Sequence, residues 1–195
     1  MIPSYRQDFN RCFTAGKYQE FLRRIEVSAG SPVEFRCSET PVFLPASLAN
    51  EMASAGRELC AQLQTQEYRR ASGAIIPAEF YVPNEPEHPL FVQADFGVIR
   101  SAGGEWDAKL IEIQGFPSIY ALQALLSATY RDVYGLDANL SSYFNDGGED
   151  GFISLFERAV LNGHRPEDVV LLEIDPYHQK TLPDFLLTQK RLGIR

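Results

Sequence analysis

The chain has 195 residues, 45% of them hydrophobic and 12% aromatic, which is enough apolar material for a folded core and excludes a disordered or fibrous protein. Lys and Arg number 18 against 26 Asp and Glu, and this net charge of −8 argues against nucleic acid as a partner. The longest apolar runs fall far short of the roughly 20 residues of a membrane helix, and no hydrophobic signal segment opens the chain. With 3 cysteines in unrelated contexts, the sequence predicts reduced thiols, a cytoplasmic location and no membrane association.

The N-terminal third favours helices. Apolar residues recur at helical spacing over 18–25, and the pattern stops at Gly30. The alternation over 33–37 predicts a short, half-buried strand. The clearest helix follows, with Ser47 as its cap and an apolar stripe that continues through Leu63 before the helix ends near 72–73.

Sheet structure is predicted after residue 89. The prolines between 74 and 89 exclude a long helix there and favour extended pieces joined by turns. Residues 90–99 and 106–113 are strand-like, and the glycine-containing segment 101–105 between them predicts a β-hairpin. A helix is predicted from about Ser118 to Tyr134.

A second unit is predicted to begin after the acidic, glycine-rich break at 145–151, which divides the chain into domains 1–145 and 146–195. It contains a helix over 152–160, a near-continuous apolar strand over 169–174 of the parallel, buried type, and a helix from about 183 to 193. A buried parallel strand needs neighbours, and two sources are open. Either the native chain continues beyond Arg195, or the strand joins the first sheet.

Polar side chains on the hairpin suggest a site for a hard metal ion. Glu112 and Gln114 are two residues apart near the end of one strand and face the same side, and Asp95 on the other strand can approach that face. Mg²⁺ prefers such oxygen ligands and usually takes one or two carboxylates from a protein. The helix that begins near Ser118 offers free N–H groups and a hydroxyl for a substrate carboxylate. The alternative is that these are ordinary surface carboxylates at a strand end.

A further candidate is His178, which follows the predicted parallel strand at the end where α/β proteins bind ligands, with Lys180 close behind it. A surface loop is the alternative for this segment.

The segments Phe91–Phe96 and Lys109–Ser118 resemble the paired strands of glutathione-synthetase-like and glutathionylspermidine-synthase-like proteins, which have a circularly permuted ATP-grasp fold. The resemblance implies that Glu112 and Gln114 bind a metal ion and that Asp95, Ser118 and Gln93 contact substrate. Gln93 stands where the family has arginine, and Gln114 where it has asparagine. Residues 1–89 carry no such resemblance.

The implied fold is mixed α+β and α/β. An antiparallel hairpin sheet with helices, part of an ATP-grasp-type domain, is followed by the start of a parallel α/β substrate-binding domain. The implied function is that of the N-terminal part of an ATP-dependent ligase that joins a small carboxylic acid to an amine, with Mg²⁺ and ATP as cofactors. No phosphate-binding glycine loop is present, so the nucleotide site is expected outside this segment, which is expected to be inactive alone. The alternative is a non-catalytic binding or scaffold protein with the same fold.

Overall fold

The computed structural model describes residues 1–115, 118–144 and 147–195 and divides the chain into two compact units. One unit consists of residues 1–43 and 118–195, and the other of residues 44–117. The predicted division into domains 1–145 and 146–195 stays a prediction. The predicted boundary between residues 145 and 146 lies outside the described residues.

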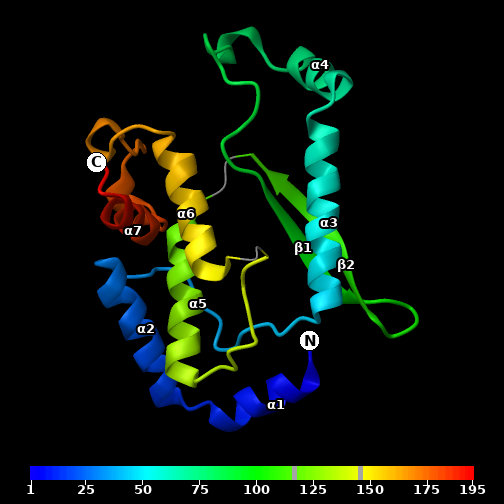
Figure 1. Cartoon of the computed structure of the whole chain (residues 1–195), viewed down its shortest axis with the longest axis vertical. Helices are drawn as coiled ribbons and strands as arrows, with labels where there is room; N and C mark the ends of the chain where they lie inside the picture. Colours follow the sequence, from blue (N-terminus) through cyan, green and yellow to red (C-terminus); the bar gives the residue numbers. More distant parts are fainter. Residues whose placement is uncertain (116–117, 145–146) are drawn as a thin grey trace. The chain divides into compact units, whose positions relative to one another are not determined.

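The larger unit is helical (Figure 1). Its α-helices are α1 (Pro3–Cys12), α2 (Ala15–Ala29), α5 (Tyr120–Tyr134), α6 (Gly148–Leu161) and α7 (Leu182–Leu192), and its short 3₁₀ helices are η2 (Pro166–Asp168) and η3 (Pro176–His178). The helices α2, α5 and α7 pack against one another. Thr14 caps α2 by accepting a hydrogen bond from the Lys17 N–H, and Gly30 ends the helix in the left-handed conformation.

An aromatic core holds the larger unit together. Phe21 and Leu122 are fully buried where α2 meets α5, and the Phe9 ring of α1 lies 4.6 Å from the ring of Tyr134. Burial of large apolar side chains is the main favourable term for such a core. The remaining members of the cluster are Ile25, Cys37 and Phe43.

The smaller unit contains the predicted hairpin and one long helix. Its elements are α3 (Ala46–Leu63), α4 (Gln66–Ala74), η1 (Ala78–Phe80), β1 (Gln93–Arg100) and β2 (Trp106–Gln114). The two strands pair antiparallel, α3 contacts β2, and Ser101 donates its N–H to the Glu105 carbonyl across the turn. The predicted mixture of helices with an antiparallel hairpin is thus confirmed in this coarse form.

Three local predictions differ from the structure in the first half of the chain. Residues 33–37 form no strand, because no second strand in the described part of the chain pairs with them. The Cys37 carbonyl accepts a hydrogen bond from the Tyr18 hydroxyl instead. The helix expected to reach residues 72–73 is two helices, since Thr65 caps a new one at α4. Ser47 is not the cap of α3, because Pro45 holds the cap position in extended backbone and Ser47 lies within the first turn; the helix begins without a side-chain cap.

The predicted parallel strand over 169–174 is also absent as a regular element. A strand is defined by its neighbours, and only Val169 and Leu171 in this segment hydrogen-bond to another extended segment, through Arg195. Of the described helices, none is long and apolar enough to cross a membrane.

Candidate functional site

Four polar side chains meet at the open end of the hairpin. Asp95 is directly opposite Glu112, and Gln93 is directly opposite Gln114 in the antiparallel register. Cross-strand partners have neighbouring side chains on one face of the sheet. The structure therefore brings together four of the five predicted site residues, which are Gln93, Asp95, Glu112 and Gln114.

A β-bulge next to Asp95 separates this polar face from the rest of the hairpin. The register places Glu112 opposite Asp95 but Leu110 opposite Phe96, so Ile111 is an extra residue in β2. Because successive strand residues point to opposite faces, the extra residue turns Leu110 to the face opposite that of Glu112. The alternating pattern that located the strand contained no sign of this bulge.

Two glutamine amides join the two carboxylates. The Nε2 of Gln93 donates to Asp95 Oδ1 at 2.9 Å. The Nε2 of Gln114 donates to both carboxylates, at 3.2 Å to Asp95 Oδ2 and at 2.6 Å to Glu112 Oε1. Asp95 is half-buried and Glu112 is exposed, so one carboxylate is held by the sheet while the other faces solvent.

This group has the chemistry of an incomplete hard-metal site. Two carboxylates and an amide match the oxygen donors that Mg²⁺ accepts, which normally leave positions for water and phosphate. Rotation of the Gln114 amide by 180° about its last bond exchanges Nε2 for Oε1 and turns a donor into a third oxygen ligand. Within the described ranges, no three His, Cys, Asp or Glu residues lie close enough to hold a metal ion.

The helix N-terminus predicted to receive a substrate carboxylate already binds a carboxylate of this chain. Asp184 of α7 is 6% exposed, and its Oδ1 accepts the Leu122 N–H of α5 at 2.8 Å. The backbone N–H groups of Ile119 and Ala121 also lower the pKa of its carboxyl. The prediction that these N–H groups are free is therefore wrong, because a buried carboxylate from a distant helix satisfies them.

Ser118 belongs to the helical unit, whereas the other four predicted site residues belong to the hairpin unit. It directly precedes Ile119, which has a positive φ angle of 63° and is the residue before α5. Phe116 and Pro117, which directly precede it, lie outside the described residues.

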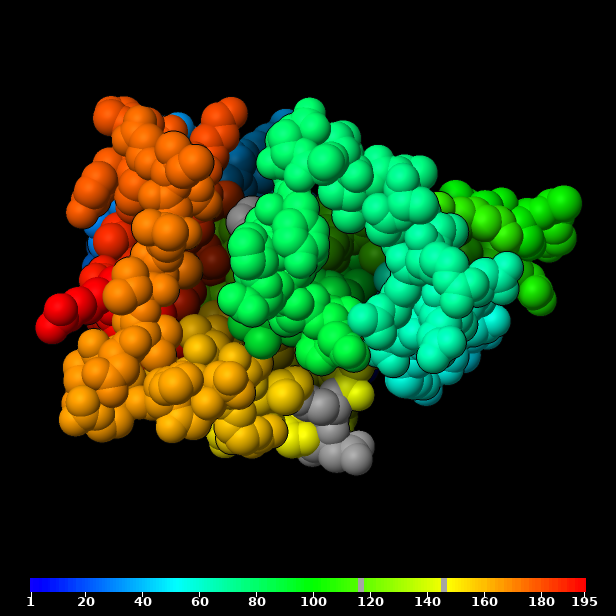
Figure 2. Space-filling model, turned by 90° about the horizontal axis from the view of Figure 1, so that it is seen from above, coloured from blue at the N-terminus to red at the C-terminus, as the bar shows by residue number. Residues whose placement is uncertain are grey.

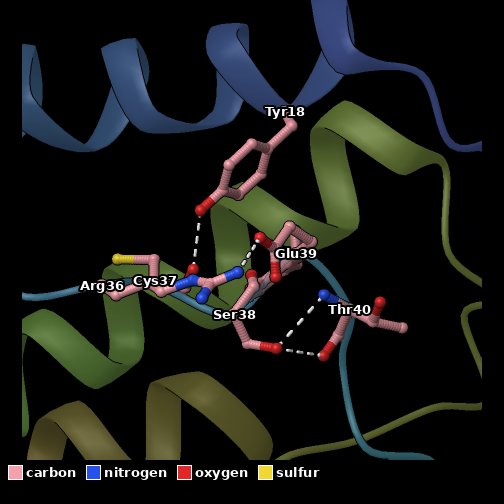
Figure 3. Close-up of polar contacts among 7 residues, drawn as sticks. Tyr18, Arg36, Cys37, Ser38, Glu39 and Thr40 are labelled. Atoms are coloured by element: carbon pink, nitrogen blue, oxygen red, sulfur yellow. Dashed lines mark hydrogen bonds and ion pairs between the residues drawn. The ribbon is translucent and has the colours of Figure 1, made fainter.

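A second polar cluster surrounds residues 36–40 in the helical unit (Figure 3). Tyr18 donates its hydroxyl to the Cys37 carbonyl at 2.7 Å, and the Tyr130 hydroxyl donates to the carbonyl of Ser38. Burial is the main cause that raises the pKa of both phenols, and the Arg36 guanidinium lowers the pKa of Glu39. These contacts satisfy the backbone of a loop that lies outside any described sheet, so the cluster is structural.

Two hollows lie elsewhere in the molecule. One of about 230 Å³ lies between α2 and residues 33–37 and is smaller than the roughly 300 Å³ at which ligand pockets begin. The other, of about 370 Å³, is lined by the start of α3 and the turn end of the hairpin, where the Arg100 guanidinium stacks 3.8 Å above the Trp106 ring. Local sequence patterns contain no signal for this stacked pair, because it depends on the hairpin register.

The predicted candidate His178 pairs locally. Its Nδ1 lies 2.7 Å from Asp175 Oδ1, and both side chains are exposed. The two residues are three apart in the sequence around η3, so their contact stabilises this turn and needs no ligand to explain it.

Comparisons of the chain with protein-family models, with curated proteins and with solved structures found no match. The hairpin geometry is therefore the main basis for a functional proposal.

Proposed function

We propose that this chain is the N-terminal part of an ATP-dependent carboxylate–amine ligase of the ATP-grasp type, located in the cytoplasm. Its hairpin forms one wall of a site for Mg²⁺, ATP, a small acid and a small amine. The observation that carries the proposal is the direct opposition of Asp95 and Glu112, with the Gln114 amide hydrogen-bonded to both carboxylates.

The donor set suits this role. Glu112 and Gln114 are the residues that would hold the metal ion. Asp95 would orient the Gln114 side chain by accepting a hydrogen bond from its amide. Bound Mg²⁺ neutralises charge on transferring phosphate groups. Glu112 is exposed, as a ligand shared with a nucleotide must be.

Gln93 limits how strongly this wall of the site can bind a negatively charged substrate. An arginine at this strand position would bind a carboxylate or phosphate by two charged hydrogen bonds. The Gln93 amide is neutral and already donates to Asp95. The proposed site therefore binds its acid substrate with less charge complementarity on this wall, and other residues of the protein supply the cation.

A second function is favoured by one observation. The Gln114 amide donates to both carboxylates, and the Gln93 amide donates to Asp95, without any ion. A binding or scaffold protein that keeps the hairpin and performs no catalysis would have such a closed network, and the two functions differ in their response to metal.

The experiment measures Mg²⁺–ATP binding to the full-length gene product by calorimetry. Wild type is compared with Glu112→Ala, and Glu105→Ala serves as a control because that glutamate is at the turn end of the same hairpin. We expect Glu112→Ala to weaken binding by at least about tenfold while the control binds like wild type. Equal binding by both variants removes Glu112 from the site, and no binding by wild type favours the non-catalytic function.

Mn²⁺ offers a direct probe of the metal site, since it accepts the same oxygen ligands as Mg²⁺. Paramagnetic broadening of NMR signals is expected to centre on the amides of Asp95, Glu112 and Gln114. Broadening spread over the other surface carboxylates would contradict the proposed site.

A further inference from the structure

The backbone of the helical unit is strained where Asp175 precedes Pro176, the only Asp–Pro pair in the sequence. Asp175 has φ 53° and ψ 57°, which is the left-handed region. Residues with a Cβ rarely adopt a positive φ, and a following proline further disfavours helical backbone angles. Strain of this kind persists only where the surrounding structure holds it, and it is common at reactive positions.

His178 contacts Asp175 twice. Its backbone N–H donates to the Asp175 carbonyl oxygen at 3.2 Å, and its Nδ1 lies 2.7 Å from Oδ1 of the Asp175 carboxylate. The first contact polarises the carbonyl of the Asp175–Pro176 bond, because a donor at this oxygen stabilises negative charge that develops there. The second contact places a protonatable nitrogen beside the carboxylate.

The pair is open to water. The side chains of Asp175 and His178 are 63% and 83% exposed, and the orange part of the chain that contains them lies on the visible surface in Figure 2. Within the described residues, no other charged side chain forms a hydrogen bond or an ion pair with either of them. The other charged groups of this segment and of α7, which packs against η3, are Glu173, Lys180, Asp184, Lys190 and Arg191.

We propose that this turn promotes cleavage of the chain between Asp175 and Pro176 by the chain itself. Oδ2 of Asp175 attacks the carbonyl carbon of the same residue, and the new C–O bond closes a cyclic anhydride. The C–N bond to Pro176 breaks, and the proton shared by His178 Nδ1 and Asp175 Oδ1 passes to the proline nitrogen. One water molecule then opens the anhydride, which leaves two carboxyl groups on Asp175 and a free amine on Pro176. The proposal is independent of the ligase function.

The chemistry of the two residues suits this reaction. The nucleophile and the carbonyl carbon belong to one residue, so no entropy of association opposes the attack. The leaving nitrogen belongs to a tertiary amide and is more basic than the nitrogen of an ordinary peptide bond, so it accepts the proton more readily. Cleavage also releases the backbone strain at Asp175.

The cleaved chain is expected to stay assembled. The helix α7 follows the cleavage point, and its Pro183, Thr188 and Leu192 are buried. Because these contacts do not depend on the broken bond, the product is a nicked molecule whose two pieces separate only after denaturation.

The test incubates the purified protein at about pH 5.5, where an imidazole is largely protonated and an aspartate is ionised. Mass spectrometry under denaturing conditions measures the new chain ends at Asp175 and Pro176. The same protein unfolded in urea gives the rate of the bond without the turn. We expect the folded protein to be cleaved at least about tenfold faster than the unfolded one.

The chain contains a matched control in the bond between Glu85 and Pro86. His88 also follows the acidic residue there by three positions, but its Nδ1 contacts the Pro89 carbonyl at 3.1 Å. Glu85 also lacks the positive φ angle of Asp175. This bond is expected to stay intact under the same conditions.

Two variants and a label test the chemical steps. Asp175→Asn removes the carboxylate nucleophile and is expected to abolish cleavage. His178→Gln keeps the backbone N–H but lacks the imidazole, and we expect it to slow cleavage by at least about tenfold. In water enriched in heavy oxygen, hydrolysis of the anhydride labels either carboxyl group of Asp175, whereas direct attack by water labels only the α-carboxyl group.

Four results would each overturn the proposal. They are an intact Asp175–Pro176 bond in the folded protein after a week, equal rates in the folded and unfolded protein, a wild-type rate in His178→Gln, and label confined to the α-carboxyl group.

Discussion

The carboxylate of Asp184 is expected to stabilise the helical unit by capping a helix to which it does not belong. It lies in α7, is 6% exposed, and accepts a hydrogen bond from the Leu122 N–H at the start of α5. Leu122 is fully buried, so water cannot replace the lost acceptor there. An unsatisfied buried donor costs about 1–3 kcal/mol and a lost cap about 0.5–2 kcal/mol.

Asp184→Ala is therefore expected to lower the free energy of unfolding by about 1–3 kcal/mol, measured by urea unfolding with circular dichroism. Asp184→Asn keeps one oxygen for the Leu122 N–H and removes a buried charge, so its loss is expected to be about 1 kcal/mol or less. The control is Asp132→Ala, because Asp132 is an exposed aspartate on α5 and its change is expected to stay within about 0.5 kcal/mol.

The pH dependence of Asp184 gives a second check. Burial raises the pKa of its carboxyl above the ordinary 3.8, against the opposing effect of the three N–H groups. A raised folded-state pKa means that the stabilisation is fully present below the unfolded-state pKa and is lost as pH rises through the folded-state pKa. The amide in the Asp184→Asn variant does not titrate, so the advantage of wild type over that variant is expected to be larger near pH 4 than at pH 7. A gap that is constant or grows with pH would refute this reasoning, as would Asp184→Ala unfolding with wild-type stability.

Three other predictions concern separate parts of the chain. Burial raises the pKa of Tyr130, so the free energy of unfolding should fall as pH rises above about 10. Tyr130→Phe should make that fall shallower, as measured by alkaline unfolding followed by phenolate absorbance. Burial also raises the pKa of the Cys37 thiol. A disulfide reagent should therefore modify the exposed Cys12 rapidly and Cys37 only at the rate of unfolding. Fast modification of both thiols would contradict the packing of Cys37. Gly97→Ala should stabilise the hairpin by about 0.5–1 kcal/mol, since the added Cβ would lie at an ordinary 3.5 Å from Ile111 Cδ1; destabilisation in thermal unfolding would show that the bulge cannot accept it.

Local signals located most of the helices and the hairpin. The 3.6-residue period predicted α2, α5 and the start of α3 within a few residues, because an amphipathic stripe is written along one contiguous segment. The glycine-containing turn at 101–105 predicted the hairpin for the same reason. Alternation failed over 33–37 and 169–174, since a strand depends on partners that the segment does not contain.

The candidate site divides in the same way. That Glu112 and Gln114 share a face follows from their spacing, and the hairpin turn brought Asp95 near them. The bulge at Ile111 and the position of Gln93 opposite Gln114 depended on the register between the strands.

The sequence by itself determined the positions of the helices, the hairpin and the carboxylates at its open end, because each is encoded within a short stretch of chain. Only the tertiary structure decided that Asp184 occupies the N-terminus of α5 from 62 residues away, and that Arg195 pairs with Val169 and Leu171. Such contacts join residues that no local period relates. They form where packing brings a donor and an acceptor together. At Asp184 and Leu122 both groups are buried, so leaving either unsatisfied would carry a large cost.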